Sequence, residues 1–191
     1  MKLENIPEFK AKYDEDLVTI YQAYNLDIAD YAVKNQQFGE GFSFKRMNWI
    51  KTSFLWIMYR SGWAMKDNQE RVLEIEIDRS FFESIIKQSV LSSYNPEIYE
   101  TKDRWGEEIS SSEVIVQFDP DRDHFGRKKS EKAIQIGLRK NALKTYLSDK
   151  IESIGDISDY VHEQYQSLRL KRLDELMMPV ERPYVFKCKS D

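Results

Sequence analysis

The pattern of apolar positions predicts strands and helices that follow one another along the chain in no strict alternation. Segments rich in β-branched and aromatic residues, or with apolar residues at every second position, predict strands. They cover residues 17–24, 72–77, 114–118 and 133–138. Apolar residues at intervals of three and four predict helices. They cover residues 26–34, 49–59, 81–91, 141–147 and 157–176. The polar segments 94–112 and 121–130 predict loops.

This order of about four strands and five helices is typical of an α+β fold. We therefore expect a mixed or antiparallel sheet of about four or more strands with helices packed on it. A length of 191 residues suits one domain, and no linker or internal repeat divides the chain. The prediction is a single domain over residues 1–191, with a C-terminal tail at residues 177–191.

Local signals predict where some of these elements begin and end. Thr52 or Ser53 stands near the start of the predicted helix at residues 49–59, and Gly62 is expected to end it. Pro120 follows Asp119 after the strand at residues 114–118. Proline cannot donate to a strand ladder, so we expect the strand to stop there.

Strict alternation at residues 72–77 makes the clearest strand prediction. Leu73, Ile75 and Ile77 share one face and are expected to be buried. Glu74 and Glu76 project from the other face, towards a cavity or solvent. Paired carboxylates can act as acid and base or bind a metal, so both are catalytic candidates. The alternative is an ordinary solvated face of a sheet.

Cations and aromatic rings are densest at residues 46–63. If the helix is continuous, Arg46, Ser53 and Arg60 share one stripe of its surface. Such a stripe offers guanidinium groups for phosphate or carboxylate and flat rings for a base. The alternative is a structural segment in which tryptophan fills the core and arginine pairs with a carboxylate. The tryptophans recur every seven residues, at Trp49, Trp56 and Trp63.

Glutamines inside apolar strands add a second polar feature. Gln22, Gln117 and Gln135 each lie within a predicted strand. A buried amide must find hydrogen-bond partners, so these residues either line a polar pocket or bond to neighbouring backbone. The resulting candidates for ligand binding are Arg46, Trp49, Lys51, Arg60, Tyr24 and Gln22.

Composition narrows the function classes. A formal net charge of −4 disfavours non-specific binding of polyanions, but leaves room for a pocket that binds one nucleotide.

No apolar run is long enough to span a bilayer, and the residues after Met1 do not resemble a secretory signal. One cysteine, Cys188, predicts no disulfide-linked partner and a reducing cytoplasmic location. His124 and His162 show no zinc-ligand spacing, so no metal is expected. No cofactor motif is present, so the cofactor stays unassigned.

Several of these segments together resemble a known family. They are RMNWIKTSFLWIMYRSGW at residues 46–63, YQAY at 21–24, QERVL at 69–73, VQFDP at 116–120 and IQIGLR at 134–139. On these segments the chain resembles, over nearly its whole length, the family catalogued as domain of unknown function 4291. It departs from the expected pattern at Thr52, where we expect Pro, and at Phe118, where we expect Trp. The family name assigns no function, so the resemblance implies no catalytic residues.

The first hypothesis is an enzyme that handles a nucleotide or another phosphate ligand. Arg46, Lys51 and Arg60 would hold phosphate, and Trp49 or Tyr24 would stack on a base. The order of elements is also loosely similar to ADP-ribosyltransferase-like folds, an analogy at the level of the fold. In that version Glu74 or Glu76 would orient the ribose.

Two other hypotheses come from different functional classes. A non-catalytic module could bind RNA or a protein through the same basic and aromatic residues. A structural interaction protein could instead dock its late helix, which carries the basic run at residues 169–172, on a partner. Substrate, reaction and oligomeric state do not follow from the sequence.

Overall fold

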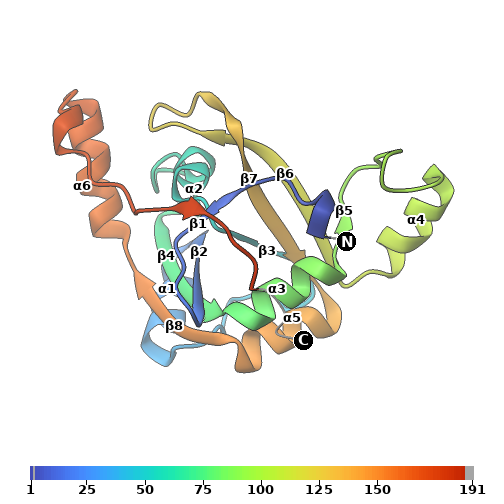
Figure 1. Ribbon diagram of the computed structural model, residues 1–191. Helices are drawn as coiled ribbons and strands as arrows, with labels where there is room; N and C mark the ends of the chain where they lie inside the picture. Colours follow the sequence, from blue (N-terminus) through green and yellow to red (C-terminus); the bar gives the residue numbers. More distant parts are fainter. Residues whose placement is uncertain (2, 188–191) are drawn as a thin grey trace.

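A seven-stranded mixed sheet forms the centre of the protein in the computed structural model, which describes residues 1 and 3–187 (Figure 1). In chain order its strands are β2 (Leu17–Tyr24), β3 (Asn48–Lys51), β4 (Arg71–Asp78), β5 (Val90–Leu91), β6 (Val114–Arg122), β7 (Lys128–Leu138) and β8 (Ile151–Asp156). Their order in the sheet is β5-β6-β7-β3-β2-β4-β8. The pair β5–β6 is parallel and the other neighbouring pairs are antiparallel. The predicted α+β class is therefore confirmed.

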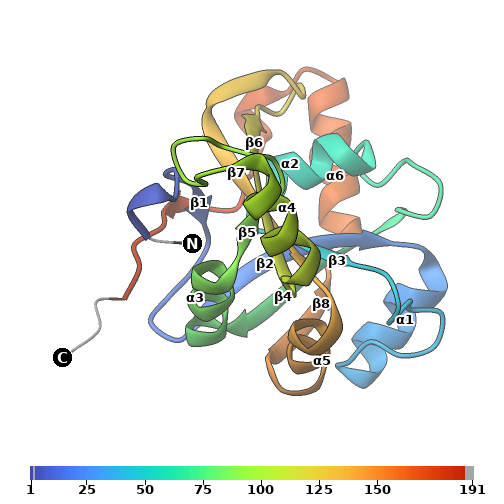
Figure 2. The ribbon, with the colours of Figure 1, turned by 90° about the vertical axis from the view of Figure 1, so that its right-hand side faces the viewer.

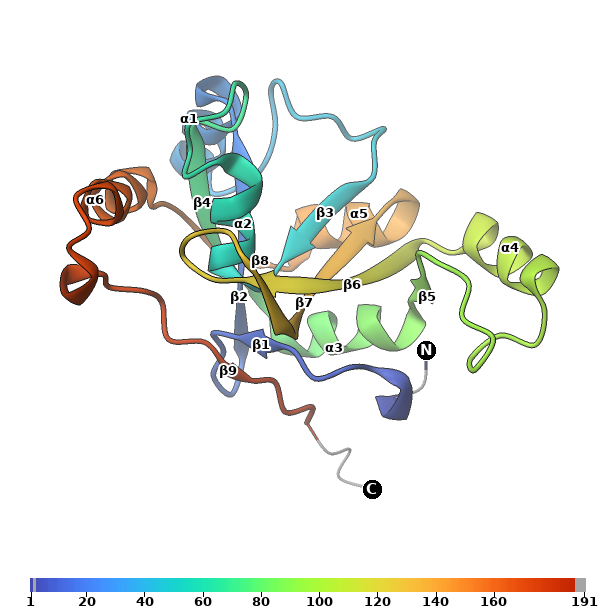
Figure 3. The ribbon, with the colours of Figure 1, turned by 90° about the horizontal axis from the view of Figure 1, so that it is seen from above.

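Helices cover both faces of this sheet (Figures 2 and 3). One face is covered by α1 (Leu26–Asn35), α3 (Arg79–Gln88) and α5 (Lys140–Asp149). The other is covered in part by α2 (Phe54–Ser61) and α6 (Ser158–Arg169). Helix α4 (Lys102–Ser111) lies beyond the β5 edge. No helix among residues 1 and 3–187 combines the length and apolar character that a bilayer-spanning helix needs.

Short elements near the two ends of the chain pack beside the sheet. Strand β1 (Lys10–Ala11) pairs antiparallel with β9 (Arg182–Pro183). Two 3-10 turns, η1 (Leu3–Asn5) and η2 (Leu173–Glu175), complete the described elements. The segment that carries β9 belongs to the predicted C-terminal tail. It pairs with β1 at residues 182–183, while Cys188 lies outside the described residues.

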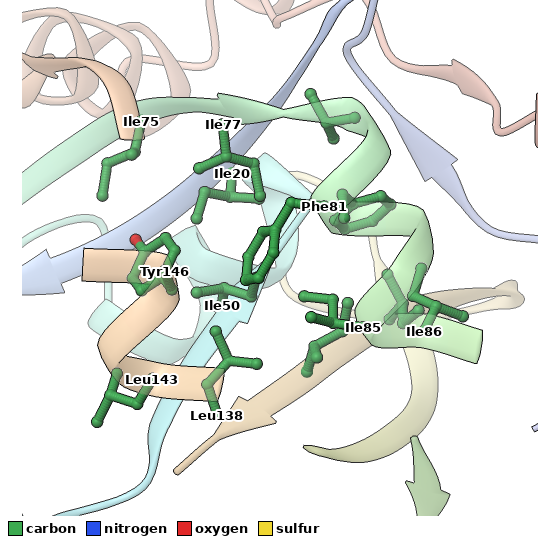
Figure 4. Close-up of a cluster of buried hydrophobic side chains, with 14 of the residues drawn as sticks. Ile20, Ile50, Ile75, Ile77, Phe81, Ile85, Ile86, Leu138, Leu143 and Tyr146 are labelled. Atoms are coloured by element: carbon green, nitrogen blue, oxygen red, sulfur yellow. The ribbon is translucent and has the colours of Figure 1, made fainter. Parts of the chain in front are cut away.

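Alternation along β4 separates the two faces as predicted. Leu73, Ile75 and Ile77 are fully buried on the face covered by α1, α3 and α5. Figure 4 shows Ile75 and Ile77 among the buried side chains of this face. Ile75 lies opposite Ile20 of β2 and Ile154 of β8, so isoleucines from three adjacent strands meet in this core. The opposite face of the sheet carries the polar residues considered below.

The predicted helix at residues 49–59 is wrong in its first part. Residues 48–51 form β3, which pairs along its whole length with β7. The helix begins only at Phe54, where the Ser53 side chain accepts a hydrogen bond from the Trp56 backbone amide. It ends as predicted at Gly62, which adopts a left-handed conformation with φ of 61°. Short apolar segments do not distinguish a strand from a helix by their periodicity alone. The shared stripe of Arg46, Ser53 and Arg60 therefore does not form.

Other boundaries also differ from the predictions. Residues 94–112, expected to be a loop, contain α4, and residues 151–156 form β8, which was not predicted. Helix α6 ends at Arg169 instead of Leu176, and Lys171 follows with φ of 59°. Strand β6 continues through Pro120 because β5 pairs with it only at residues 115–116. Proline is tolerated there since one side of the strand needs no ladder donor.

Candidate functional site

A row of polar side chains crosses the face of the sheet on which α2 packs. Lys51 lies directly opposite Gln135 of β7, and Gln135 lies opposite Gln117 of β6. In the other direction, Lys51 lies opposite Tyr21 of β2, and Tyr21 lies opposite Glu74 of β4. Directly opposed residues of antiparallel strands share a face. The register therefore places all five side chains, which we call the polar row, on one side of the sheet.

Lys51 is the cation of this row, and its environment is unusual for a charged group. Its half-buried ammonium donates a 2.9 Å hydrogen bond to the Trp49 carbonyl oxygen and lies 5.8 Å from the centroid of the Trp56 ring. Within the part of the chain that the structure describes, it forms no ion pair with a carboxylate. Burial, followed by the positive charge of Arg60, lowers the pKa of Lys51 to about 7.

The structure brings together only two of the three cations that were predicted to share a site. Arg60 lies exposed in the last turn of α2, close enough that its charge acts on Lys51. Arg46 lies exposed in the loop before β3, and no contact joins it to either residue within residues 1 and 3–187. Lys51 and Arg60 are therefore neighbours, while Arg46 stands apart at the other end of β3.

Trp49 lies against the sheet beside the polar row. It is opposite Gly137, where an added Cβ would come within 2.5 Å of the Met47 sulfur and 3.2 Å of Trp49 Cε2. Because Gly137 has no Cβ, the Trp49 indole and the Met47 thioether can pack closely against the backbone of β7. Trp49 remains half-buried, which leaves part of its ring accessible. Trp56 differs, since it is only 7% exposed and its indole Nε1 has no hydrogen-bond partner among the described residues.

Gln22 fills a split between β2 and β3. The two strands pair only at Tyr21 and Lys51 and then separate. The Gln22 amide spans the gap by donating to Asn48 Oδ1 at 2.7 Å and to the Trp49 carbonyl at 3.1 Å. Its Oε1 accepts a 3.2 Å bond from the Tyr146 hydroxyl. A small cavity of about 190 Å³ opens at this split.

Tyr24 lies at the same split but belongs to the aromatic packing around it. Its hydroxyl accepts a 2.9 Å hydrogen bond from Asn48 Nδ2, and its ring packs against Phe38 and Phe42 at 5.3 and 6.0 Å. Burial raises the pKa of Tyr24. The hydrogen bonds of Gln22 and Tyr24 thus hold the two strands at a fixed separation. Both residues also line the small cavity.

An amide and carboxylate cluster, which sequence reasoning missed as a unit, lies at the other end of the polar row. Gln117 Nε2 donates to both carboxylate oxygens of Asp119, at 2.9 and 3.1 Å, and Gln135 Nε2 donates to Asp119 Oδ2. A cavity of about 540 Å³ is lined by residues 116–119 on one side and by residues 91–96 on the other. The available signal was the spacing of Gln117 and Asp119, which places both on one face of a strand.

The two candidate carboxylates of β4 lie on the same face, with Glu74 at the end of the polar row opposite to Gln117. Glu74 forms a 3.1 Å ion pair with Lys12 and lines a separate cavity of about 580 Å³. Glu76 accepts a 2.9 Å hydrogen bond from the Ser153 hydroxyl. Tyr21 stands between Glu74 and Lys51 in the row, and the Phe54 ring packs on Tyr21 with a centroid separation of 5.6 Å. The structure therefore does not bring the β4 carboxylates to Lys51.

Two further carboxylates hold the start of α2. The Ser53 hydroxyl donates a 2.7 Å hydrogen bond to Asp121 Oδ1, and Glu181 Oε1 accepts a 2.7 Å bond from the Phe54 amide. Burial raises the pKa of Glu181 to about 8, against the lowering effect of the Phe54 amide and with a further rise from Asp121. These contacts fix the helix that brings Trp56 and Arg60 to the polar row. Sequence reasoning gave no role to Asp121 or Glu181.

The histidines take no part in this site. His124 packs against Phe125 in the turn between β6 and β7, with ring centroids 4.2 Å apart, and His162 lies on α6. Within the described ranges, no group of three or more His, Cys, Asp or Glu side chains is arranged to hold a metal ion.

Comparison with known protein families gives a match over most of the chain. The family model with the description Domain of unknown function (DUF4291) matches residues 8–184. No curated protein shows significant similarity to the chain. Three of the segments that carry the family resemblance meet at the polar row. Residues 46–63 supply β3 and α2, residues 116–120 supply Gln117 and Asp119, and residues 134–139 supply Gln135.

Proposed function

The chain belongs to the family described as Domain of unknown function (DUF4291), and from its geometry we propose that it handles a nucleotide or a similar phosphate-bearing ligand on the α2 side of β3. Lys51 and Arg60 bind the phosphate, and Trp49 stacks on the base. One observation carries the proposal. Lys51 is a half-buried cation beside a second cation, and neither forms an ion pair with a carboxylate of the described residues.

The cost of burying charge supports an anionic ligand. A desolvated ammonium is unfavourable unless an opposite charge or good hydrogen bonds compensate for the lost water. Lys51 has one backbone carbonyl as acceptor, and its pKa of about 7 reflects this poor compensation. Phosphate oxygens accept strong charge-assisted hydrogen bonds from both ammonium and guanidinium groups. A bound phosphate would thus stabilise the charged forms of Lys51 and Arg60 together.

The position of Trp49 supports a base next to that phosphate. Trp49 is two residues from Lys51 on the same face of β3, a separation of about 7 Å along a strand. That spacing suits a ligand whose phosphate and flat ring are joined by one sugar. Stacking of a base on an accessible aromatic ring contributes about 1–3 kcal/mol. The half-buried ring of Trp49, supported by Met47 over Gly137, offers such a surface.

Lys51 also suits a catalytic role in this proposal. A lysine whose pKa lies near 7 is partly neutral at physiological pH and can act as a general base or a nucleophile. ADP-ribosyl transfer would further need Glu74 or Glu76 at the ligand. Glu74 is paired with Lys12 on the far side of Tyr21, so we assign an acid–base role at the ligand to Lys51 instead.

Ligand titration tests the proposal. The wild-type protein is expected to be stabilised by ATP, ADP or NAD and by inorganic pyrophosphate, with a gain of about 2.7 kcal/mol at 100 times the dissociation constant. Arg60→Glu should abolish this stabilisation because it replaces a phosphate-binding cation by a repelling anion. Arg169→Glu, a matched reversal at the exposed end of α6, should leave it unchanged. No stabilisation of the wild type by any of these ligands would contradict the proposal.

The tryptophans separate base stacking from folding. Trp49→Phe should weaken nucleotide binding and leave pyrophosphate binding intact, because only the base contacts the ring. Trp56→Phe should mainly lower the melting temperature, since this ring is buried in the apolar cluster under α2. Tight binding of single-stranded RNA with no binding of mononucleotides would favour the alternative of a non-catalytic RNA-binding module.

A further inference from the structure

The orientation of two glutamine amides is determined by the carboxylate between them. An ionised carboxylate only accepts hydrogen bonds, so the amide group that faces it must present its nitrogen. Gln117 and Gln135 both donate through Nε2 to Asp119. Their carbonyl oxygens are therefore held facing away from Asp119. The cluster of Gln117, Asp119 and Gln135 thus presents acceptors, with a negative charge behind them.

These carbonyl oxygens lack donors. Among residues 1 and 3–187, no hydrogen bond is directed to Oε1 of Gln117 or Gln135, although Gln135 is only 8% exposed. Because the two residues are directly opposed on β6 and β7, their Cβ atoms are about 4.5–5.5 Å apart. Neither oxygen is among the fully buried polar atoms without a partner in the described residues, so both remain accessible to solvent and to a ligand. A cavity of about 540 Å³ is lined by Gln117 and Asp119, so a ligand can approach the cluster from the Gln117 side.

The cluster lies where the base of the proposed ligand would reach. Gln135 is directly opposite Lys51 and is two residues from Gly137 on the same face of β7. Trp49 Cε2 lies over Gly137, so a base stacked on this ring would lie about 7 Å along β7 from Gln135. The phosphate at Lys51 and the base edge at the cluster are then about one to two strand spacings apart, or about 5–10 Å.

We propose that Gln117, Asp119 and Gln135 recognise a base edge that donates N–H groups, such as the amino group of adenine, and reject a keto edge in its place. This inference rests on the proposed function, because it places the phosphate of the same ligand at Lys51. The two amide oxygens accept from the amino hydrogens, and Asp119 holds both amides in that orientation. A keto oxygen would meet two acceptors and a carboxylate, which repel it.

ATP and ITP provide the test, since they differ only in the amino or keto group of the purine and the adjoining ring proton. The wild-type protein is expected to bind ATP at least about tenfold more tightly than ITP, the difference that one or two hydrogen bonds supply. Asp119→Asn should remove this preference, because an asparagine can both donate and accept and no longer fixes the glutamines. Pyrophosphate binding should not change in this variant. Asp159→Asn, at an exposed position on α6, is the control.

A second variant covers the case in which Asp119→Asn does not fold. Gln117→Met removes one acceptor from a half-buried position and should reduce the preference for ATP over ITP. Its unfolding temperature is measured first, and binding is compared only if the fold is retained. An unchanged preference in a folded Gln117→Met variant would overturn the assignment.

Lys51→Met separates the two proposals. It should weaken ATP, ITP and pyrophosphate alike if Lys51 binds phosphate. If Lys51→Met does so while the wild type binds ATP and ITP equally, base recognition is overturned and the phosphate site stands. If Lys51→Met changes none of these affinities while Asp119→Asn removes a clear preference for ATP, the proposed phosphate site fails and base recognition stands. Binding of neither nucleotide would overturn both.

Discussion

Glu181 Oε1 accepts a 2.7 Å hydrogen bond from the Phe54 backbone amide, and this contact joins the C-terminal segment to the first turn of α2. Since α2 carries Trp56 and Arg60, the segment helps to position these two residues beside the polar row. The partner is 127 residues away along the chain. The contact also places a carboxyl group in a poorly hydrated position.

This burial predicts that stability depends on pH. The carboxyl group has an ordinary pKa of 4.5, and burial raises the pKa of Glu181 in the folded protein to about 8. Between these values the folded protein binds more protons than the unfolded chain, so the free energy of unfolding falls as the pH rises. Glu181→Gln keeps an acceptor for the Phe54 amide and removes the charge. It should be more stable than the wild type above pH 8, with a Tm gain of about 2–4 °C for each 1 kcal/mol recovered.

Thermal unfolding at several pH values between 4.5 and 8.5 measures this effect. Glu163→Gln, at an exposed position of α6, is the matched control and should follow the wild-type profile. Identical pH profiles of the Glu181→Gln variant and the wild type would contradict the predicted titration of Glu181.

The lowered pKa of Lys51 predicts selective chemical labelling at neutral pH. An ordinary lysine, with a pKa near 10.5, has about one neutral amine in 3,000 at pH 7. With a pKa of about 7, half of the Lys51 side chains are neutral there. Reductive methylation followed by peptide mass spectrometry should show Lys51 labelled with a midpoint near pH 7. A bound phosphate ligand should move this midpoint upwards, because an anion favours the ammonium form.

Exposed Lys144 of α5 reports the access of the reagent in the same experiment. Labelling of Lys51 only at strongly alkaline pH would show that its amine is fully charged at neutrality. That outcome would remove the basis for an acid–base role of Lys51.

Gly137 is predicted to be required for the position of Trp49. In Gly137→Ala the new Cβ would approach the Met47 sulfur to 2.5 Å and Trp49 Cε2 to 3.2 Å, so one or both must move. Overpacking of this kind costs about 1–3 kcal/mol. Chemical denaturation should show this loss, and Met47→Ala in the same chain should recover part of it. Gly106→Ala in α4, where an added Cβ meets nothing within 4 Å, should instead stabilise by about 0.5–1 kcal/mol.

Ile75 is predicted to be a central determinant of core stability. It is fully buried and lies opposite Ile20 of β2 and Ile154 of β8. Figure 4 shows Ile75 beside Ile20 in this core. Ile75→Ala should lower the free energy of unfolding by about 2–5 kcal/mol, because it removes apolar contacts and leaves a cavity. Val180→Ala, at a side chain 85% exposed, should change stability by less than about 0.5 kcal/mol. Equal effects of the two substitutions would contradict the assigned core.

Local signals alone were sufficient for part of this fold. The alternation in β4 predicted which of its side chains are buried, and the apolar, β-branched run at residues 17–24 predicted β2 with its observed bounds. Gly62 ends α2 as expected, because a left-handed backbone favours glycine. These features depend on side-chain periodicity and on backbone conformation within a few residues, which the sequence determines directly.

The tertiary structure decided the rest, because the deciding interactions are long-range. Residues 48–51 form a strand because they pair along their whole length with β7, and that pairing brings Lys51 opposite Gln135. The role of Asp119 likewise depends on an amide from another strand. The sequence identified Lys51 and Arg60 as candidates for binding an anion. The fold alone determined which charged groups lie near Lys51 and how far it is removed from water, and these two factors determine its pKa.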